Sequence, residues 1–195
     1  ALDGLETVVL AGIPLAPGIE VDAALRRLQP LAEDGVVVAA ISDGRGGTLM
    51  QTIPAPALEC WAGPILGHDG GRLFLARSDS FTHGYAFVDD RTFIITSGPP
   101  GGVRPLIAYE LGLLPADAIV WSPFECTTAI EGHFPRAEAN EGGVASGLLP
   151  CRHVKIAIDS DNELAEVFGN NVTATASYIL LQAAAMSEIY TSQMN

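Results

Sequence analysis

The sequence predicts an α+β protein in which a mostly antiparallel β region is followed by a C-terminal strand–helix unit. Three observations lead to this prediction. Short runs rich in β-branched and aromatic residues recur between residues 36 and 96, separated by Gly, Pro or Asp turns. The chain contains 21 glycines and 13 prolines, which imply many turns. One long helical pattern without Gly or Pro lies near the end of the chain.

The beginning of the chain predicts a strand and then a short helix. Residues 7–10 form a strand-like apolar run that prolines and a glycine soon interrupt. Residues 22–31 show helical spacing, with three apolar residues on one face and Arg26 and Arg27 on the other. We therefore expect a helix there, ending near Pro30.

The middle of the chain predicts hairpins. Residues 36–41 are continuously apolar and too few for a helix, so we expect a buried strand that pairs with residues 48–53 across a Gly-Gly turn. Residues 73–77 alternate as another strand. Residues 81–88 and 91–96 are two apolar runs joined by an Asp-Asp turn, which is a second hairpin signal.

The pattern divides the chain into three parts. Residues 1–124 form the mostly β part, and residues 125–150, which lack periodicity, are expected to be a linker or exposed loop. Residues 151–195 form the strand–helix unit, with a strand at 154–158 and the long helix at 173–190.

Composition excludes some partners. The chain has 23 acidic and 10 basic residues, a formal net charge of -13, so nucleic acid and anionic membrane surfaces are not expected partners. No apolar run approaches the roughly 20 residues of a membrane-spanning helix. Ala1 is the kind of residue that a signal peptidase leaves behind, so we expect a soluble, secreted or extracellular protein whose signal peptide has been removed.

The C-terminal segments resemble a known family. The order "VKIAIDSDNEL", "FGNNVTATASYI" and "MSEIY" is similar to the opening of the catalytic domain in metzincin zinc peptidases of the reprolysin type, particularly secreted bacterial members. The stretches "GRLFLARSDSFTHGYAFVDDRTFIITSGPPG" and "LPADAIVWSPFEC" resemble the region upstream of that domain. The resemblance implies a pro-region followed by the first β-α unit of a peptidase.

The zinc-binding element of that family is absent from the sequence. The H-E-x-x-H-x-x-G-x-x-H pattern places two histidines on one helix face with a Glu that activates water, and no two of this chain's four histidines are close in sequence. We therefore expect no catalytic residue in this chain, and zinc only in a peptidase domain downstream. The resemblance implies a non-catalytic, pro-region-like part that assists folding of its own peptidase domain and inhibits it.

A second function remains open. The chain is also consistent with a structural or self-assembling extracellular protein derived from such a precursor. Its apolar composition and alanine-rich helix leave surface for contacts between copies of itself.

The cysteines allow two readings. A disulfide between Cys126 and Cys151 would close a loop and stabilise the folded state by roughly 3 kcal/mol. Alternatively, one of the two is a cysteine switch, a thiolate that occupies the open position of a catalytic zinc. Cys60 is then expected to be a buried free thiol beside Trp61.

The acidic turn after the predicted C-terminal strand is a candidate Ca²⁺ site. Asp159, Asp161 and Glu163 alternate there, and carboxylate oxygens are the ligands that Ca²⁺ prefers. An EF-hand is excluded, because Leu164 occupies the position that needs glycine. The alternative is a capping turn in which Asp161 or Asn162 accepts hydrogen bonds from the next helix.

Two further motifs have simpler structural explanations. The Ser78-Asp79-Ser80 run near His83 lacks the G-x-S-x-G elbow of a hydrolase, so we expect a polar turn between strands. Asn171-Val172-Thr173 is a glycosylation sequon, but Asn171 or Thr173 is also suited to cap the following helix.

Overall fold

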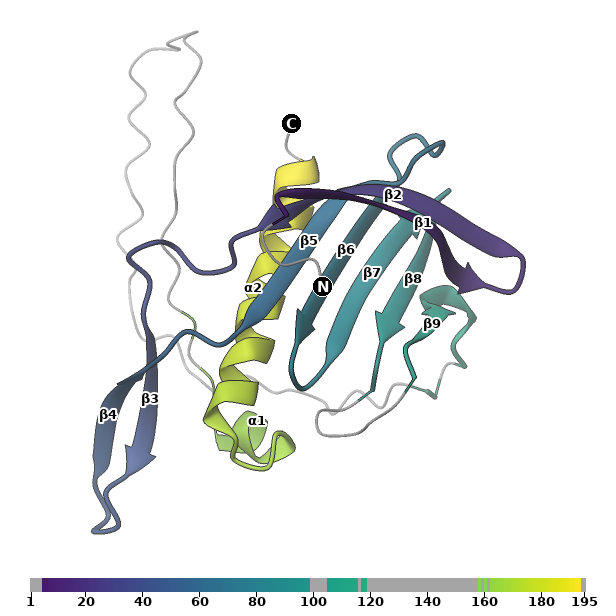
Figure 1. Ribbon diagram of the computed structural model, residues 1–195. Coiled ribbons are helices and arrows are strands. Elements are labelled where there is room, and N and C mark those ends of the chain that lie inside the picture. Colours follow the sequence, from purple (N-terminus) through teal and green to yellow (C-terminus); the bar gives the residue numbers. More distant parts are fainter. Residues whose placement is uncertain are drawn as a thin grey trace, which may run out of the picture. The chain divides into compact units, whose positions relative to one another are not determined.

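The computed structural model describes residues 5–98, 105–115, 117–118, 158, 160 and 162–193 (Figure 1). The described strands and helices confirm the predicted class, because the chain is α+β and mostly antiparallel β. They belong to one compact unit, made by residues 1–114 together with residues 158–195.

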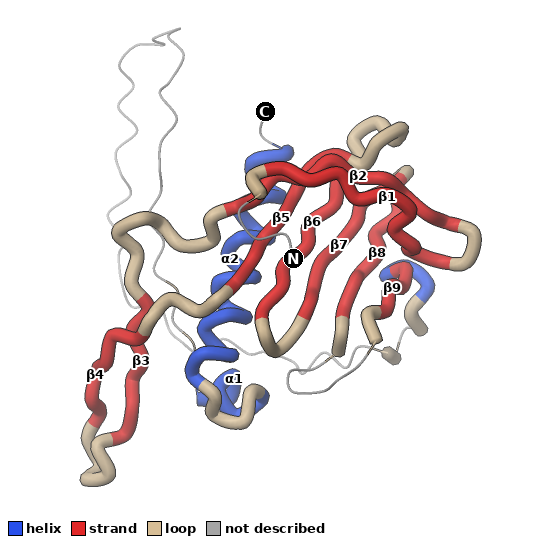
Figure 2. The backbone as a smooth tube through the Cα atoms, viewed as in Figure 1, coloured by secondary structure: helices blue, strands red, loops and turns tan. Residues whose placement is uncertain are grey.

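A seven-stranded sheet dominates this unit (Figure 2). All its neighbouring strands are antiparallel. The predicted strands at 7–10, 73–77, 81–88 and 91–96 are confirmed as parts of it. In spatial order the strands are β1 (Thr7–Ala16), β2 (Ile19–Leu28), β5 (Leu58–Pro64), β6 (Arg72–Ser78), β7 (Thr82–Val88), β8 (Arg91–Thr96) and β9 (Ile107–Glu110).

The sheet curls until its two end strands, β1 and β9, approach each other. Because side chains alternate along a strand, the curl separates an inner from an outer apolar face. The inner core consists of Leu15, Val21, Ala23, Leu25, Trp61, Ile65, Leu73, Ala86, Val88, Phe93 and Ile95. The outer core consists of Cys60, Ala62, Phe74, Ala76, Phe81, Phe168, Ala174, Leu181 and Ala184.

The Asp-Asp turn joins β7 and β8 as predicted. Val88 pairs with Arg91, so Asp89 and Asp90 form a two-residue hairpin loop with φ angles of 48° and 64°. A turn of this hand matches the twist of the flanking strands, and Asp is one of the side chains that tolerate positive φ.

The helix predicted at residues 22–31 is wrong, because this segment lies largely in β2. Val21, Ala23 and Leu25 are buried in the inner core, which is the two-residue period of a strand. Gly18, with a φ of 76°, permits the tight turn from β1 that places β2 beside it. A short apolar segment can fit the period of a helix or that of a strand. Pairing with β1 and β5 made this segment a strand.

A separate two-stranded sheet comes from β3 (Val37–Ser42) and β4 (Thr48–Ile53). The predicted hairpin is confirmed, but the predicted burial of its first strand is wrong. Ala39 is the one residue of the two strands that is buried, while Val38, Leu49 and Met50 are 45%, 59% and 65% exposed. We call this element the β3–β4 hairpin.

The predicted C-terminal helix is confirmed as α2 (Val172–Gln193). A short helix, α1 (Asn162–Val167), precedes it, and a 3-10 turn, η1 (Leu111–Leu113), follows β9. The side chain of Asn171 caps α2, because its Oδ1 accepts a hydrogen bond from the Ala174 amide at 3.1 Å. The capping role proposed for this sequon is thereby confirmed for Asn171.

The remaining elements of the sequence prediction fall outside the described residues. The linker at 125–150 lies there in full. The strand at 154–158 lies there except for Ile158, which is exposed.

Candidate functional site

Helix α2 lies on the outer face of the sheet, against β5 and β6 (Figure 1). Five of its buried side chains are spaced alternately three and four residues apart, which keeps them on one helix face. They are Ala174, Ser177, Leu181, Ala184 and Glu188. The last of these is a carboxylate at an apolar position, and it lies within the "MSEIY" segment of the family resemblance.

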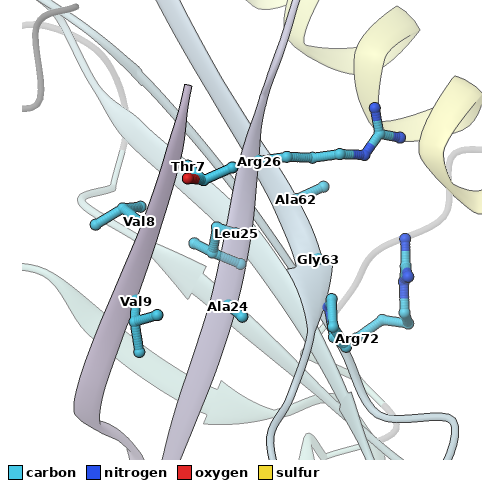
Figure 3. A pocket seen from close by; sticks show the side chains of 10 residues that line it. Thr7, Val8, Val9, Ala24, Leu25, Arg26, Ala62, Gly63 and Arg72 are labelled. Atoms are coloured by element: carbon cyan, nitrogen blue, oxygen red, sulfur yellow. The ribbon is translucent and has the colours of Figure 1, made fainter. Parts of the chain in front are cut away.

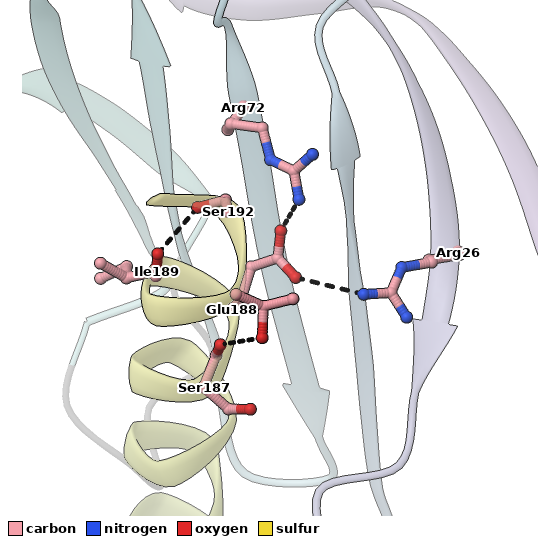
Figure 4. Close-up of polar contacts among 7 residues, drawn as sticks. Arg26, Arg72, Ser187, Glu188, Ile189 and Ser192 are labelled. Atoms are coloured by element: carbon pink, nitrogen blue, oxygen red, sulfur yellow. Dashed lines mark hydrogen bonds and ion pairs between the residues drawn. The ribbon is translucent and has the colours of Figure 1, made fainter. Parts of the chain in front are cut away.

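Glu188 makes ion pairs with two arginines of the sheet (Figure 4). Arg72, at the start of β6, contacts Oε1, and the Nη2 atom of Arg26, in β2, lies 3.6 Å from Oε2. Each carboxylate oxygen of Glu188 thus faces one guanidinium group. We call these three residues the Glu188 triad.

The burial of the triad is asymmetric. The Glu188 side chain is 2% exposed, while those of Arg72 and Arg26 are 29% and 57% exposed. Removing a carboxylate from water costs several kcal/mol, and nearby opposite charges offset that cost. Because water reaches both arginines, their own desolvation cost is small. The arrangement favours one position of the helix on the sheet, where Glu188 meets both charges.

A pocket of about 320 Å³ opens beside the triad, over the first strands of the sheet (Figure 3). We call it the arginine pocket, because Arg26 and Arg72 both line it. Its other lining residues are Thr7, Val8, Val9, Ala24, Leu25, Ala62, Gly63 and Pro64.

Small residues keep the floor of the arginine pocket open. A Cβ atom at Gly63 would overlap the carbonyl oxygen of Ala24, so β5 requires glycine where it passes β2. Ala24 and Ala62 add little side-chain volume on either side. The floor is therefore apolar, and the charged groups lie at its edge.

An aromatic cluster with a histidine lies farther along the same helix–sheet contact. The ring of Tyr178 in α2 meets those of Phe81 and His83 edge-on, at centroid distances of 6.3 and 6.2 Å. The Thr96 hydroxyl accepts the Gly98 amide and lies 2.8 Å from Nδ1 of His83. Burial lowers the pKa of His83 and favours the neutral imidazole.

The Ser78-Asp79-Ser80 run near His83 forms the turn between β6 and β7. The Ser78 hydroxyl oxygen accepts hydrogen bonds from the amides of Ser80 and Phe81, at 3.1 and 3.3 Å. The predicted polar turn between strands is confirmed, since Ser78 serves the turn itself.

The predicted ligand and disulfide residues fall mostly outside the described part. Cys126, Cys151, Asp159 and Asp161 all lie there, so the disulfide and the Ca²⁺ site stay predictions. Glu163 is exposed in the first turn of α1. Within the described ranges, no three His, Cys, Asp or Glu side chains form a group that could hold a metal.

The prediction for Cys60 is confirmed. Its thiol is free and fully buried in the outer core, and burial raises its pKa to about 12. A thiol with such a pKa is overwhelmingly protonated at neutral pH and is a weak nucleophile.

Sequence reasoning missed the Glu188 triad. A signal for it was present, because Glu188 is the one charged residue in the α2 sequence and continues the helix's alternating apolar spacing. Its partners could not be found, because the spacing of residues 22–31 predicts a helix with Arg26 on the face opposite its apolar residues. The strand β2 turns Arg26 toward the outer face and Arg27 toward the opposite one.

Comparison of the chain with protein-family models, curated proteins and solved structures yields no match. In the described part of the chain, no helix is both long and apolar enough to cross a membrane.

Proposed function

We propose that this chain is the non-catalytic, pro-region-like part of a secreted metzincin-like zinc peptidase precursor. One observation carries the proposal. The helix that bears the peptidase-like "MSEIY" segment lies against the β sheet, and Glu188 of that segment is buried between Arg26 and Arg72. The sheet would thus hold the first helix of the peptidase portion.

This arrangement suits a folding assistant. A buried carboxylate is costly when it is unpaired. The packing of α2 on the sheet is therefore most stable when Glu188 faces the two arginines. The buried stripe of α2 also contacts the outer core, which orients the helix along the sheet. A pro-region that holds one helix in this way reduces the number of conformations available to the segments that follow the helix.

Zinc chemistry would belong to the downstream peptidase domain. The sequence contains no zinc-binding helix pattern, and the proposed role of this chain is inhibition and folding assistance. The proposed partner is accordingly the peptidase domain of the same precursor.

The intact mass of the natural protein tests the precursor. We expect a mass well above the 20.4 kDa of these residues, bound zinc, and casein hydrolysis that a zinc chelator abolishes after the pro-region is removed. A natural mass of 20.4 kDa without zinc would overturn the proposal.

Refolding of the zinc-bound precursor tests the role of Glu188. The Glu188→Ala precursor should regain less peptidase activity after dilution from denaturant than the wild type. Gln182→Ala is the matched control, because Gln182 is exposed on the same helix. Equal recovery for both variants would show that the sheet does not guide folding through Glu188.

A second function, self-assembly outside the cell, is favoured by the β3–β4 hairpin. Its exposed Leu49 and Met50, with Val36 just before it, leave apolar surface that a second copy could bury. Sedimentation velocity distinguishes the two functions. Self-assembly requires oligomers that weaken in a Leu49→Ser, Met50→Ser variant, whereas a pro-region alone remains a monomer.

A further inference from the structure

We propose that the arginine pocket is a binding site for a carboxylate that carries a short apolar tail, such as the C-terminus of a peptide. This inference does not depend on the proposed function. It rests on the placement of two arginines beside an apolar cavity on the outer face of the sheet (Figure 3).

The molecule already places a carboxylate at these arginines. Glu188 contacts both Arg26 and Arg72, so the two guanidinium groups converge closely enough to share one anion (Figure 4). Guanidinium groups present planar arrays of donors that match carboxylate geometry.

Glu188 does not use all the donors of the two arginines. Arg26 approaches it at 3.6 Å, beyond an ordinary hydrogen bond, and is 57% exposed. Both side chains line the pocket, and a second carboxylate there would meet the exposed donors of Arg26 that Glu188 leaves unused.

The local charge favours an anion even though the chain as a whole is acidic. Two arginines against one glutamate leave a surplus of one positive charge at the edge of the pocket. The formal net charge of -13 repels anions at long range, but salt screens that repulsion beyond about 8 Å at physiological ionic strength.

The pocket also determines what the ligand carries besides its charge. Val9 and Pro64 line it together with small residues, which offers apolar contact to a tail. Its volume of about 320 Å³ lies at the lower end of the range of small-molecule sites, about 300–1,000 Å³. One amino-acid residue with an aliphatic side chain therefore suits it better than a longer or more polar ligand.

An NMR titration of the full chain tests the site. The probe is N-acetyl-leucine, and N-acetyl-leucinamide is the matched control without charge. We expect the acid to shift the backbone amide signals of Val9 and Gly63, and the amide to shift them far less. N-acetyl-glutamic acid α-amide forms a third arm. Equal binding of that probe would retain the carboxylate site and assign it to acidic side chains instead of peptide ends.

Two variants identify the residues that bind. Arg26→Gln should weaken binding by about tenfold or more, because a charge-assisted hydrogen bond is lost. Val9→Asp adds a negative charge at a position that is 65% exposed, so it should weaken binding without harming the fold, and Val9→Asn is its neutral control. Equal binding of acid and amide, or unchanged affinity in both charge variants, would overturn the proposal.

Discussion

The seven-stranded sheet and the β3–β4 hairpin are built from similar residues, but their apolar side chains differ in burial. Both contain short, β-branched, apolar runs joined by tight turns. In the large sheet, Phe74 and Phe93 are 1% and 0% exposed. In the hairpin, Leu49 and Met50 remain more than half exposed.

The two elements differ in whether other parts of the molecule pack over their apolar faces. The curl of the large sheet buries its inner face against itself, and α2 packs against part of its outer face. A two-stranded hairpin cannot curl over its own side chains, and alone it is marginally stable in water. An apolar run therefore predicts a strand, while the neighbours of that strand decide its burial.

Truncation of an inner-core residue should give the largest effect in this comparison. Phe93→Ala removes a ring that is completely buried in β8, and we expect a loss of about 3–5 kcal/mol in the free energy of unfolding. Urea denaturation followed by tryptophan fluorescence measures it. A loss below about 1 kcal/mol would mean that the inner core is loosely packed.

Loss of the α2 cap should have a smaller effect. Asn171→Ala removes the acceptor of the Ala174 amide, and we expect the free energy of unfolding to fall by about 1 kcal/mol. Asn171→Asp retains an acceptor and should unfold close to the wild type under the same conditions. If both substitutions were equally destabilising, the side-chain cap would not be the cause.

The covered outer face should also make stability depend on pH through His83. Burial lowers its pKa below the ordinary value of 6.5, so the unfolded chain binds a proton more readily than the folded one. The contribution of His83 is therefore complete above pH 6.5 and is lost progressively as the pH falls below that value. Urea titrations across this range should give a steeper acid loss for the wild type than for His83→Gln. Parallel curves would contradict the assignment.

The hairpin should give the smallest effect. Met50→Ala truncates a side chain that is 65% exposed, so we expect a change within about 0.5 kcal/mol in the free energy of unfolding. The experiment is the same urea denaturation, at a concentration where the protein is monomeric. A loss comparable to that of Phe93→Ala would mean that another surface covers the hairpin.

Several elements could be predicted because their signals are local. The Asp89-Asp90 turn, the β4 strand and the helix from Val172 follow from turn chemistry, alternation and helix composition over short windows. The segment of β2 could not be predicted, since its apolar residues suited a helix as well as a strand. Pairing with β1 and β5 supplied the missing information, and those partners lie on opposite sides of it in the sheet.

The sequence by itself determined the α+β class, the hairpins and the extent of α2, because these depend on residues close together in the chain. Tertiary structure alone decided the burial of each strand and the meeting of Glu188 with Arg26 and Arg72. These three residues are far apart in sequence and on three different elements. The electrostatic interaction between them depends on distance in space, and the curl of the sheet with α2 upon it sets that distance.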